Sequence, residues 1–196
     1  MSGQAPSIAF GIQGLGVHIP ERRVSNADIA DQYGVDPEWI ERMTGVRQRQ
    51  YAEPGQATSD LAVSAAEHAL ADAHLSPRDI DIILVATSTP DQLAVATACR
   101  VQHRLGADRA WATDVGGACA GFLYALKTAR DILAASHPDG RALVVGAETF
   151  GNTGAASIPM ALHVAREQGR LHPESTVLHA AVGAGMSWAG TVQRWL

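Results

Sequence analysis

The chain has 196 residues, of which 46% are hydrophobic and 18% charged, and its formal net charge is -5 at pH 7. This composition is typical of a globular protein with one large domain or two small ones. The acidic balance and the lack of a basic cluster argue against a nucleic-acid partner. The apolar runs are far shorter than a membrane span, and the N-terminal segment lacks the pattern of a signal peptide. We therefore expect no membrane partner and a cytoplasmic location.

The cysteines and histidines give no metal-site pattern. The two cysteines, Cys99 and Cys119, are too few for a disulfide framework or a structural zinc site. The eight histidines are scattered without metal-ligand spacing. We expect no bound metal.

The first part of the chain predicts one strand followed by three helices. Ser25 is a candidate N-cap with Asp28 three residues later, and Asp36 is the candidate cap of the next helix. Thr58 or Ser59 is the candidate cap of the third helix, which has apolar residues at helical spacing. The strand is expected over 7–20, and the helices over 24–34, 36–43 and 58–74.

The middle of the chain alternates between strands and helices. Apolar, β-branched runs predict strands that are covered on both faces, and this alternation predicts a parallel sheet. After residue 150 a glycine-bearing loop leads into a helix over 155–168, and two strands follow within 175–196 around a Gly-Ala-Gly turn. The predicted strands of the middle part are 79–88, 110–115 and 141–148, and its helices are 95–106 and 121–136.

Cys119 stands between a predicted strand and a predicted helix. The first turn of a helix presents unpaired N–H groups and a partial positive charge, which favour an anionic sulfur. The surrounding glycines and alanines leave room for a substrate carbonyl, and nearby backbone N–H groups are positioned to stabilise an oxyanion. The alternative is that Cys119 is a small buried apolar residue, and the local pattern leaves both interpretations open. For Cys99, inside an apolar helical run, we expect packing in the core.

Seven stretches of the sequence resemble, in order, the β-ketoacyl-ACP synthase III family of condensing enzymes, which have a thiolase-like fold. Three segments within them, "TGVRQR", "ACAGF" and "GNTGAASIP", are specific enough to make chance agreement improbable. The stretches are "GVHIPERRVSNADIA", "DPEWIERMTGVRQRQYA", "DIDIILVATST", "DVGGACAGFLYAL", "ALVVGAE", "GNTGAASIPMAL" and "GAGMSWAG".

The resemblance implies roles for three residues in the chemistry. Cys119 would accept the acyl group as a thioester, and Asn152 would donate a hydrogen bond to the enolate oxygen. The backbone N–H groups of Cys119 and Ala184 would form the oxyanion hole. The alternative for Asn152 is a turn or capping residue before the helix over 155–168.

The resemblance also implies a CoA site at Trp39 and Arg47. Trp39 lies where the family stacks a tryptophan on the adenine ring, although a helix residue packed on the core is an alternative. Between Trp39 and Thr44 the family commonly has an arginine for the CoA phosphates. This chain has Met43 there, with Arg42 one position away.

The family's sequences are much longer, and the difference lies inside this chain. "VVGAE" continues through Thr149 and Phe150 directly into "GNTGAAS", so the intervening block with the family's catalytic histidine has no counterpart. The expected fold is a layered α/β, thiolase-like one. Its N-terminal βα half, 1–149, is complete, whereas the C-terminal half, 150–196, is reduced to one helix and two strands. Uncovered apolar faces would then favour a homodimer.

The implied function is condensation of an acyl-CoA with malonyl-ACP through an acyl-cysteine, in fatty-acid or polyketide-type biosynthesis. No cofactor is expected, and the partners are acyl-CoA and acyl carrier protein. Without the histidine block the activity is expected to be impaired. The alternative is a non-catalytic structural or regulatory partner of a condensing enzyme, or an inactive truncated product.

Overall fold

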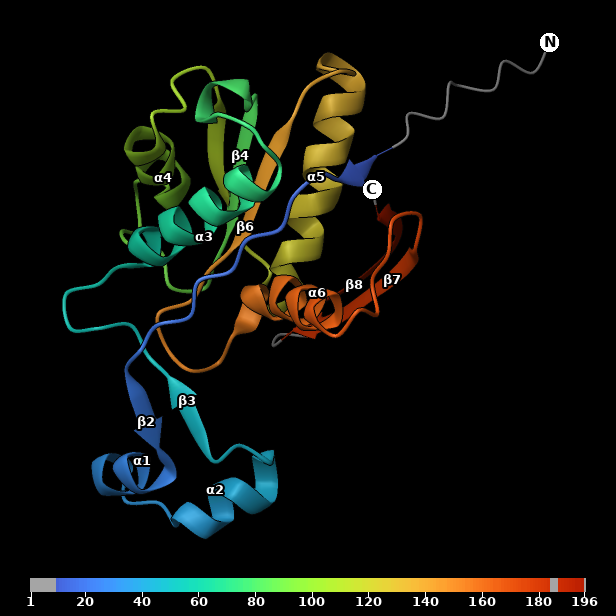
Figure 1. Ribbon diagram of the computed structural model, residues 1–196. Coiled ribbons are helices and arrows are strands. Elements are labelled where there is room, and N and C mark those ends of the chain that lie inside the picture. Colours follow the sequence, from blue (N-terminus) through green and yellow to red (C-terminus); the bar gives the residue numbers. More distant parts are fainter. Residues whose placement is uncertain (1–9, 184–186, 196) are drawn as a thin grey trace.

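The centre of the protein is a three-stranded parallel sheet with the order β5-β4-β6. A computed structural model describes residues 10–183 and 187–195 (Figure 1). The strands are β4 (Ile82–Ala86), β5 (Trp111–Val115) and β6 (Ala142–Gly146), each with five residues. All five residues of β4 are buried, as expected for the middle strand of a sheet covered on both faces.

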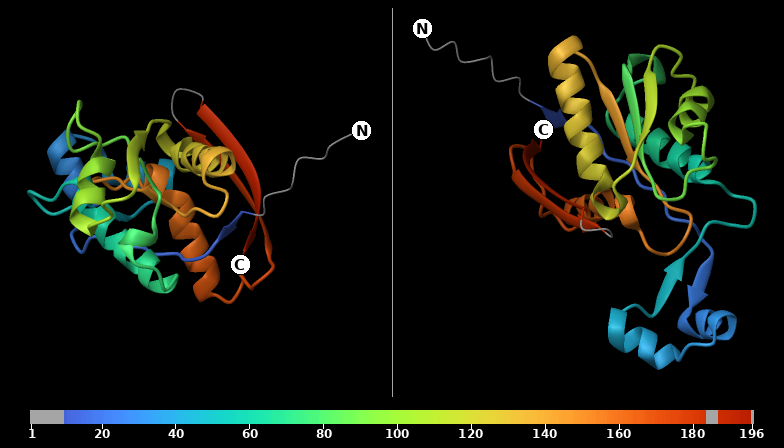
Figure 2. Two further views of the ribbon diagram at one scale, coloured as in Figure 1. Left: turned by 90° about the horizontal axis from the view of Figure 1, so that it is seen from above. Right: turned by 180° about the vertical axis from the view of Figure 1, so that it is seen from behind.

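Helices cover both faces of this sheet. The helices α3 (Thr58–Asp72) and α4 (Thr97–Leu105) pack on the face that carries Ile83 and Val85. Helix α5 (Gly121–Ser136) packs on the opposite face, which carries Leu84. The alternating sides of the pleat thus fill two hydrophobic clusters, and Figure 2 shows the resulting three layers. No helix in the described ranges is long and apolar enough to cross a membrane.

The C-terminal part forms a second, smaller layer. It contains helix α6 (Ser157–Glu167) and an antiparallel hairpin of β7 (Thr176–Gly183) and β8 (Ser187–Trp195). These elements confirm the expected one helix and two strands. The short strand β1 (Gly11–Ile12) pairs in parallel with β8, so the small sheet has the order β1-β8-β7. The division of the chain into two parts at residue 149 stays a prediction. The strand β1 precedes that residue but pairs with β8 of the C-terminal part.

The predicted strand over 7–20 is wrong for most of its described length. Only Gly11–Ile12 are paired, and residues 13–20 run as an extended segment along the body (Figure 1). Alternating apolar residues therefore mark an extended backbone here, but the residues beside it do not supply a second ladder of hydrogen bonds.

A small lobe projects from the body at the end where α5 begins (Figure 1). Its helices confirm the predicted caps: Ser25 and Asp28 form a capping box at α1, and the Asp36 carboxylate accepts N–H bonds at the start of α2. The two-stranded antiparallel ladder of the lobe was not predicted, because its strands are short and polar. The elements are β2 (Arg23–Ser25), α1 (Asn26–Tyr33), α2 (Pro37–Thr44) and β3 (Gln48–Gln50).

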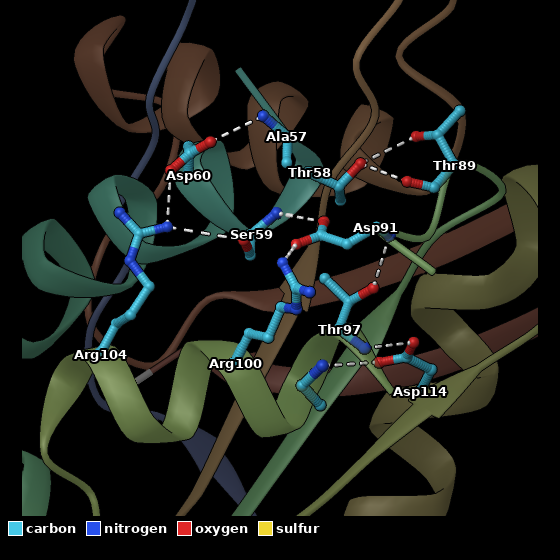
Figure 3. A network of polar contacts seen from close by, with 11 residues as sticks. Ala57, Thr58, Ser59, Asp60, Thr89, Asp91, Thr97, Arg100, Arg104 and Asp114 are labelled. Carbon is cyan, nitrogen blue, oxygen red and sulfur yellow. Dashed lines mark hydrogen bonds and ion pairs between the residues drawn. The ribbon is translucent and has the colours of Figure 1, made fainter. Parts of the chain in front are cut away.

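The predicted cap of α3 is wrong, because its first residues bind a loop instead. The N-cap is Ala57, while the Thr58 hydroxyl donates to the Thr89 carbonyl and the Ser59 N–H donates to the Asp91 carboxylate at 2.9 Å (Figure 3). These bonds hold the loop that follows β4 against α3.

A second carboxylate performs the same task for α4. Asp114, near the end of β5, accepts the N–H groups of Thr97 at 2.7 Å and Ala98 at 2.8 Å (Figure 3). A carboxylate at a helix N-terminus satisfies unpaired donors and complements the helix dipole. The loop after β4 and the carboxyl end of β5 are therefore both fixed to helix N-termini.

The expectation that Cys99 packs in the core is wrong. Its side chain is exposed on α4, with Sγ 3.8 Å from the carbonyl oxygen of Ala112. Helix α4 buries its neighbours Ala98 and Val101 instead. A one-residue step along a helix turns the side chain by about 100°, which is enough to move it from the core to the surface.

We expect a pH-dependent loss of stability on replacing Asp60. Its carboxylate accepts the Ala57 N–H at 2.6 Å and pairs with Arg104 at 2.6 Å. The Ala57 N–H lowers the pKa of Asp60, with Arg104 acting in the same direction against partial burial. A carboxyl with a lower pKa in the folded chain stabilises the fold at neutral pH, and this contribution disappears as the pH falls through that pKa. Asp60→Asn should lower the free energy of unfolding by at most about 1 kcal/mol at pH 7.

The measurement is urea denaturation of wild type and Asp60→Asn at pH 7 and at pH 3. The difference between the two proteins should shrink at the lower pH. Glu67→Gln, on the exposed side of the same helix, is the matched control and should leave the difference near zero at both pH values. An equal loss for Asp60→Asn at both pH values would contradict the assignment.

Candidate active site

Cys119 lies in a strained turn between β5 and α5. The structure confirms its place between strand and helix, although it belongs to the 3-10 turn η2 (Ala118–Ala120) rather than to α5 itself. Gly117 has a φ of 149° and Ala118 a φ of 46°, a value that side-chain-bearing residues seldom adopt. The thiol of Cys119 is free and partly exposed. Strain of this kind persists only where surrounding contacts hold the turn.

Backbone N–H groups of η2 and of the first turn of α5 adjoin Cys119 in the chain. Within η2 the first N–H bond runs from Ala120 to the Gly117 carbonyl at 3.0 Å, so the Cys119 N–H precedes the bonded part of the turn. Helix α5, 16 residues long, starts two residues after Cys119 and presents its positive end there. The turn is thus suited to stabilise negative charge on the sulfur or on a bound carbonyl oxygen.

The hairpin β7–β8 is fixed to this turn by two side chains. The Ser187 hydroxyl donates to the Gly117 carbonyl at 3.1 Å, and the Tyr124 hydroxyl of α5 donates to the Trp188 carbonyl at 3.0 Å. The first residues of β8 therefore lie against the Cys119 turn. Ala184, the predicted second oxyanion donor, lies outside the described residues. Its role stays a prediction.

The loop that carries Asn152 also meets the Cys119 turn. Asn152 precedes the 3-10 turn η3 (Gly154–Ala156), and η3 is in contact with η2. The Asn152 side-chain oxygen accepts the Gly154 N–H at 3.1 Å, which gives the residue the turn-forming role that was its alternative. This bond uses the amide oxygen, whereas the predicted enolate contact uses the –NH2 group of the same amide.

Glu148 is a polar residue of this region to which the sequence analysis gave no role. It follows β6 at the carboxyl end of the sheet. Its carboxylate accepts the Ser88 N–H at 3.0 Å and the Thr89 hydroxyl at 2.9 Å. Its position directly after a buried strand was a usable signal, because carboxyl ends of parallel strands meet at one edge. Glu148 closes the loop after β4 against the loop that leads to Asn152.

Trp39 and Arg47 lie on the projecting lobe rather than beside the Cys119 turn (Figure 1). The Trp39 side chain is 48% exposed, which argues against the alternative that it packs in a core. Arg47 is exposed and paired with Glu41 at 2.7 Å. The lobe connects to the site through the Ala52 N–H, which donates to the Thr149 carbonyl at 2.9 Å. Contact of Trp39 and Arg47 with CoA stays a prediction.

Two histidines of the C-terminal part, His163 and His179, lie within regular elements and are at least partly buried. His163 lies in α6, and His179 in β7 is 5% exposed. Burial lowers the pKa of His179, and the amide of Gln193 acts in the opposite direction. Among the described residues there is also no group of three or more His, Cys, Asp or Glu side chains that could hold a metal ion.

We expect Gly146→Ala to disturb the site through the backbone of η3. A Cβ at Gly146 would lie 2.3 Å from the carbonyl oxygen of Ala155, so η3 would have to move. Overpacking of this kind costs about 1–3 kcal/mol of stability. Gly116→Ala is the matched control, because a Cβ there meets no described atom within 4 Å. Thermal unfolding of both variants checks the prediction, and an unchanged midpoint for Gly146→Ala would contradict the close approach.

Known proteins match this chain in both its parts. The family model for the C-terminal part of 3-oxoacyl-[acyl-carrier-protein] synthase III matches residues 126–195. A β-ketoacyl-[acyl-carrier-protein] synthase III from Rhodopirellula baltica is 50% identical over 143 residues, which are 72% of this chain and 40% of that protein. Over these residues the chain is similar to β-ketoacyl-ACP synthases III. It spans less than half the length of the curated relatives that it matches.

Two further similar proteins are named for other activities. An acetoacetyl-CoA synthase from a Streptomyces species is 45% identical over 143 residues, 73% of this chain and 43% of that protein. The priming β-ketosynthase of the R1128 polyketide pathway is 34% identical, with a TM-score of 0.62 over 70% of this chain and 41% of that one.

The fold itself matches solved structures. The 3-oxoacyl-ACP synthase III of Aquifex aeolicus superposes with a TM-score of 0.84 at 22% identity, covering 94% of this chain and 99% of that one. The fold is therefore the α/β, thiolase-like one of the β-ketoacyl-ACP synthases III.

Proposed function

We propose that this chain is an acyltransferase of the β-ketoacyl-ACP synthase III type that carries an acyl group on Cys119. The observation that supports this most is the Cys119 turn itself. A free, partly exposed thiol lies in a strained turn at the start of α5, and the Asn152 loop contacts that turn. A packed structural cysteine needs neither the strain nor the exposure.

In the first step the Cys119 thiolate attacks the thioester carbonyl carbon of acyl-CoA. A carbon–sulfur bond forms to Cys119, and the carbonyl π electrons move to oxygen, where backbone N–H groups of the turn stabilise the charge. When the carbonyl reforms, the bond to the CoA sulfur breaks and CoA leaves as a thiolate, which takes a proton from water. The product is acyl-Cys119.

In the second step malonyl-ACP loses CO2 to give an enolate, and the enolate carbon attacks acyl-Cys119. The Asn152 –NH2 group donates to the enolate oxygen, and Cys119 leaves as thiolate when the new carbon–carbon bond has formed. Loss of CO2 drives this step, so the reaction needs no cofactor. Because the family's histidine block has no counterpart here, we propose that the second step is impaired. Loss of one donor of this kind costs about 10²–10³ in rate.

Intact-mass spectrometry tests the proposal directly. Incubation with acetyl-CoA should give one acetyl adduct that maps to Cys119, and addition of malonyl-ACP should give no detectable β-ketoacyl-ACP. Condensation at a normal rate would show that another residue replaces the histidine. A folded protein without any adduct would instead support the alternative, a non-catalytic partner of a condensing enzyme.

We also propose a homodimer. The outer face of the hairpin supports it, because Leu178, Val182, Trp188 and Val192 are all exposed there. Contiguous apolar surface on a monomer marks an interface. Sedimentation should give a dimer for wild type and a monomer for Val192→Asp. A wild-type monomer would contradict the proposal.

We also propose a cytoplasmic location, which the state of the two thiols supports. Cys99 and Cys119 are both free, and the thiol of Cys99 is exposed, as suits a reducing compartment. Acyl-CoA and acyl carrier protein, the proposed partners, would have to be present there. Fractionation of cells that express the chain at native level tests the location, and recovery outside the cytoplasmic fraction would contradict it.

A further inference from the structure

Strand β6 has an unpaired edge that faces into the protein. In the described part of the chain β6 pairs only with β4, on one side. The Arg141 carbonyl accepts the Ile82 N–H at 3.3 Å, and the Ala147 N–H donates to the Ala86 carbonyl at 3.1 Å. Odd-numbered residues thus face β4. Because backbone groups alternate along a parallel strand, the N–H and C=O groups of Ala142, Val144 and Gly146 point away from β4.

This edge borders a cavity of about 690 Å³. On its far side lies the extended segment 10–20, which runs along the body instead of pairing with β6 (Figure 1). We call the space between β6 (Ala142–Gly146) and the segment 10–20 the strand slot. Close-packed interiors contain few voids larger than a water molecule, so the strand slot is a space for a missing component.

Apolar helix faces close the strand slot on both sides. Leu61, Ala66 and Leu70 of α3 line it from one side of the sheet, and Phe122, Leu126 and Leu133 of α5 line it from the other. The same helices cover β4, which is apolar on both faces. The environment of the strand slot is therefore that of another buried strand beside β6.

The chemistry of the edge favours a polypeptide over a hydrocarbon. Buried backbone N–H and C=O groups require hydrogen-bond partners, which a second backbone supplies and an alkyl chain does not. The charges of the lining favour acidic flanks. Three arginines, Arg49, Arg130 and Arg141, outnumber the two carboxylates, Asp139 and Glu148, and Glu148 already accepts bonds from Ser88 and Thr89.

We propose that the strand slot binds an extended, apolar polypeptide segment with acidic flanks, which adds to the sheet as a further strand beside β6. A segment of about five residues matches the five residues of β4, β5 and β6. The backbone groups of Ala142, Val144 and Gly146 bind it, and the faces of α3 and α5 cover its side chains. This binding involves neither Cys119 nor an acyl group, so it stands apart from the proposed enzyme activity.

The probe is a capped peptide with the β4 sequence IILVA between glutamates. Binding should protect the amides of Ala142, Val144 and Gly146 from hydrogen exchange, and it should raise the melting temperature progressively with peptide concentration. A peptide with lysines in place of the glutamates should bind at least about 3-fold more weakly. A peptide that is N-methylated at alternate amides should not bind. Because the change is made in the peptide, this test does not depend on how a protein variant folds.

Two variants at one position separate backbone pairing from apolar contact. Val144→Pro removes an outward N–H while the ladder to β4 remains, and should weaken binding at least about 10-fold. Val144→Thr keeps the N–H and the branched shape and should bind the peptide as wild type does. Two results would identify a hydrocarbon pocket and overturn the proposal. The first is that the N-methylated peptide binds wild type as tightly as the unmethylated peptide. The second is that laurate binds wild type and Val144→Pro with equal affinity. Concentration-dependent protection of these amides without peptide would identify a second copy as the occupant and overturn it too.

Discussion

Cys119→Ser should lose the acyl adduct on incubation with acyl-CoA. The serine hydroxyl keeps the shape of the turn, but it ionises far less readily than a thiol. The rate of adduct formation should fall by about 10⁶-fold, as when the nucleophile of a covalent enzyme is removed. Intact-mass measurements over time at fixed acetyl-CoA check this.

The matched control for this substitution is Cys99→Ser. Cys99 is the second cysteine of the chain, and its side chain is the more exposed of the two. If simple exposure governed labelling, Cys99 would react first and its replacement would remove the adduct. We expect Cys99→Ser to be acylated at the wild-type rate. Loss of the adduct in Cys99→Ser but not in Cys119→Ser would overturn the assignment of the nucleophile.

Leu84→Ala should lower the free energy of unfolding by about 2–5 kcal/mol. Leu84 is the middle residue of β4 and is 0% exposed, with its side chain in the cluster formed with α5. Removing three carbons from a site enclosed by a sheet and a helix leaves a cavity that the surroundings cannot fill. The melting temperature should fall by about 2–4 °C for each kcal/mol. Urea and thermal denaturation, followed by circular dichroism, measure both quantities.

Leu93→Ala provides the same chemical change at a different place. Leu93 lies in the loop after β4 and is fully exposed. Its replacement should change the free energy of unfolding by no more than about 0.5 kcal/mol. Similar losses at the two positions would contradict the assignment of Leu84 to the core.

Local signals predicted the elements whose stability is local. Ser25 with Asp28, and Asp36, cap α1 and α2 as the sequence indicated, because these bonds involve residues two or three positions apart. The buried apolar run over 82–86 predicted the central strand for a related reason. Each of these features is decided by neighbours in the chain.

The errors occurred where distant residues decide. Thr58 and Ser59 have the side chains of good caps, but their bonds go to Thr89 and Asp91, 31 and 32 positions away. The same holds for β3, whose polar residues pair with β2 only because the lobe folds back on itself. No local pattern reports the partner in such cases.

The sequence predicted the Cys119 turn of the candidate site, but local patterns did not predict the residues that surround this turn. The glycine-rich pattern around Cys119 indicated the turn, because such small residues have a local conformational reason to be there. The contact of that turn with the Asn152 loop joins segments about 30 positions apart, and only the resemblance to the family suggested it. Glu148 was missed because its partners lie in the loop after β4.

The conformation of Ala118 has a consequence for how the protein fails on heating. A residue with a φ of 46° lies about 1–2 kcal/mol above a relaxed turn, and the bonds from Ser187 and Tyr124 keep it there. These bonds belong to the hairpin, whereas the bulk of the secondary structure belongs to the central sheet. Warming should therefore release the hairpin and let the turn uncoil first. Acylation of the thiol by acyl-CoA should therefore be lost several degrees below the midpoint of thermal unfolding measured by far-ultraviolet circular dichroism. At that temperature the central sheet and its helices should still be folded.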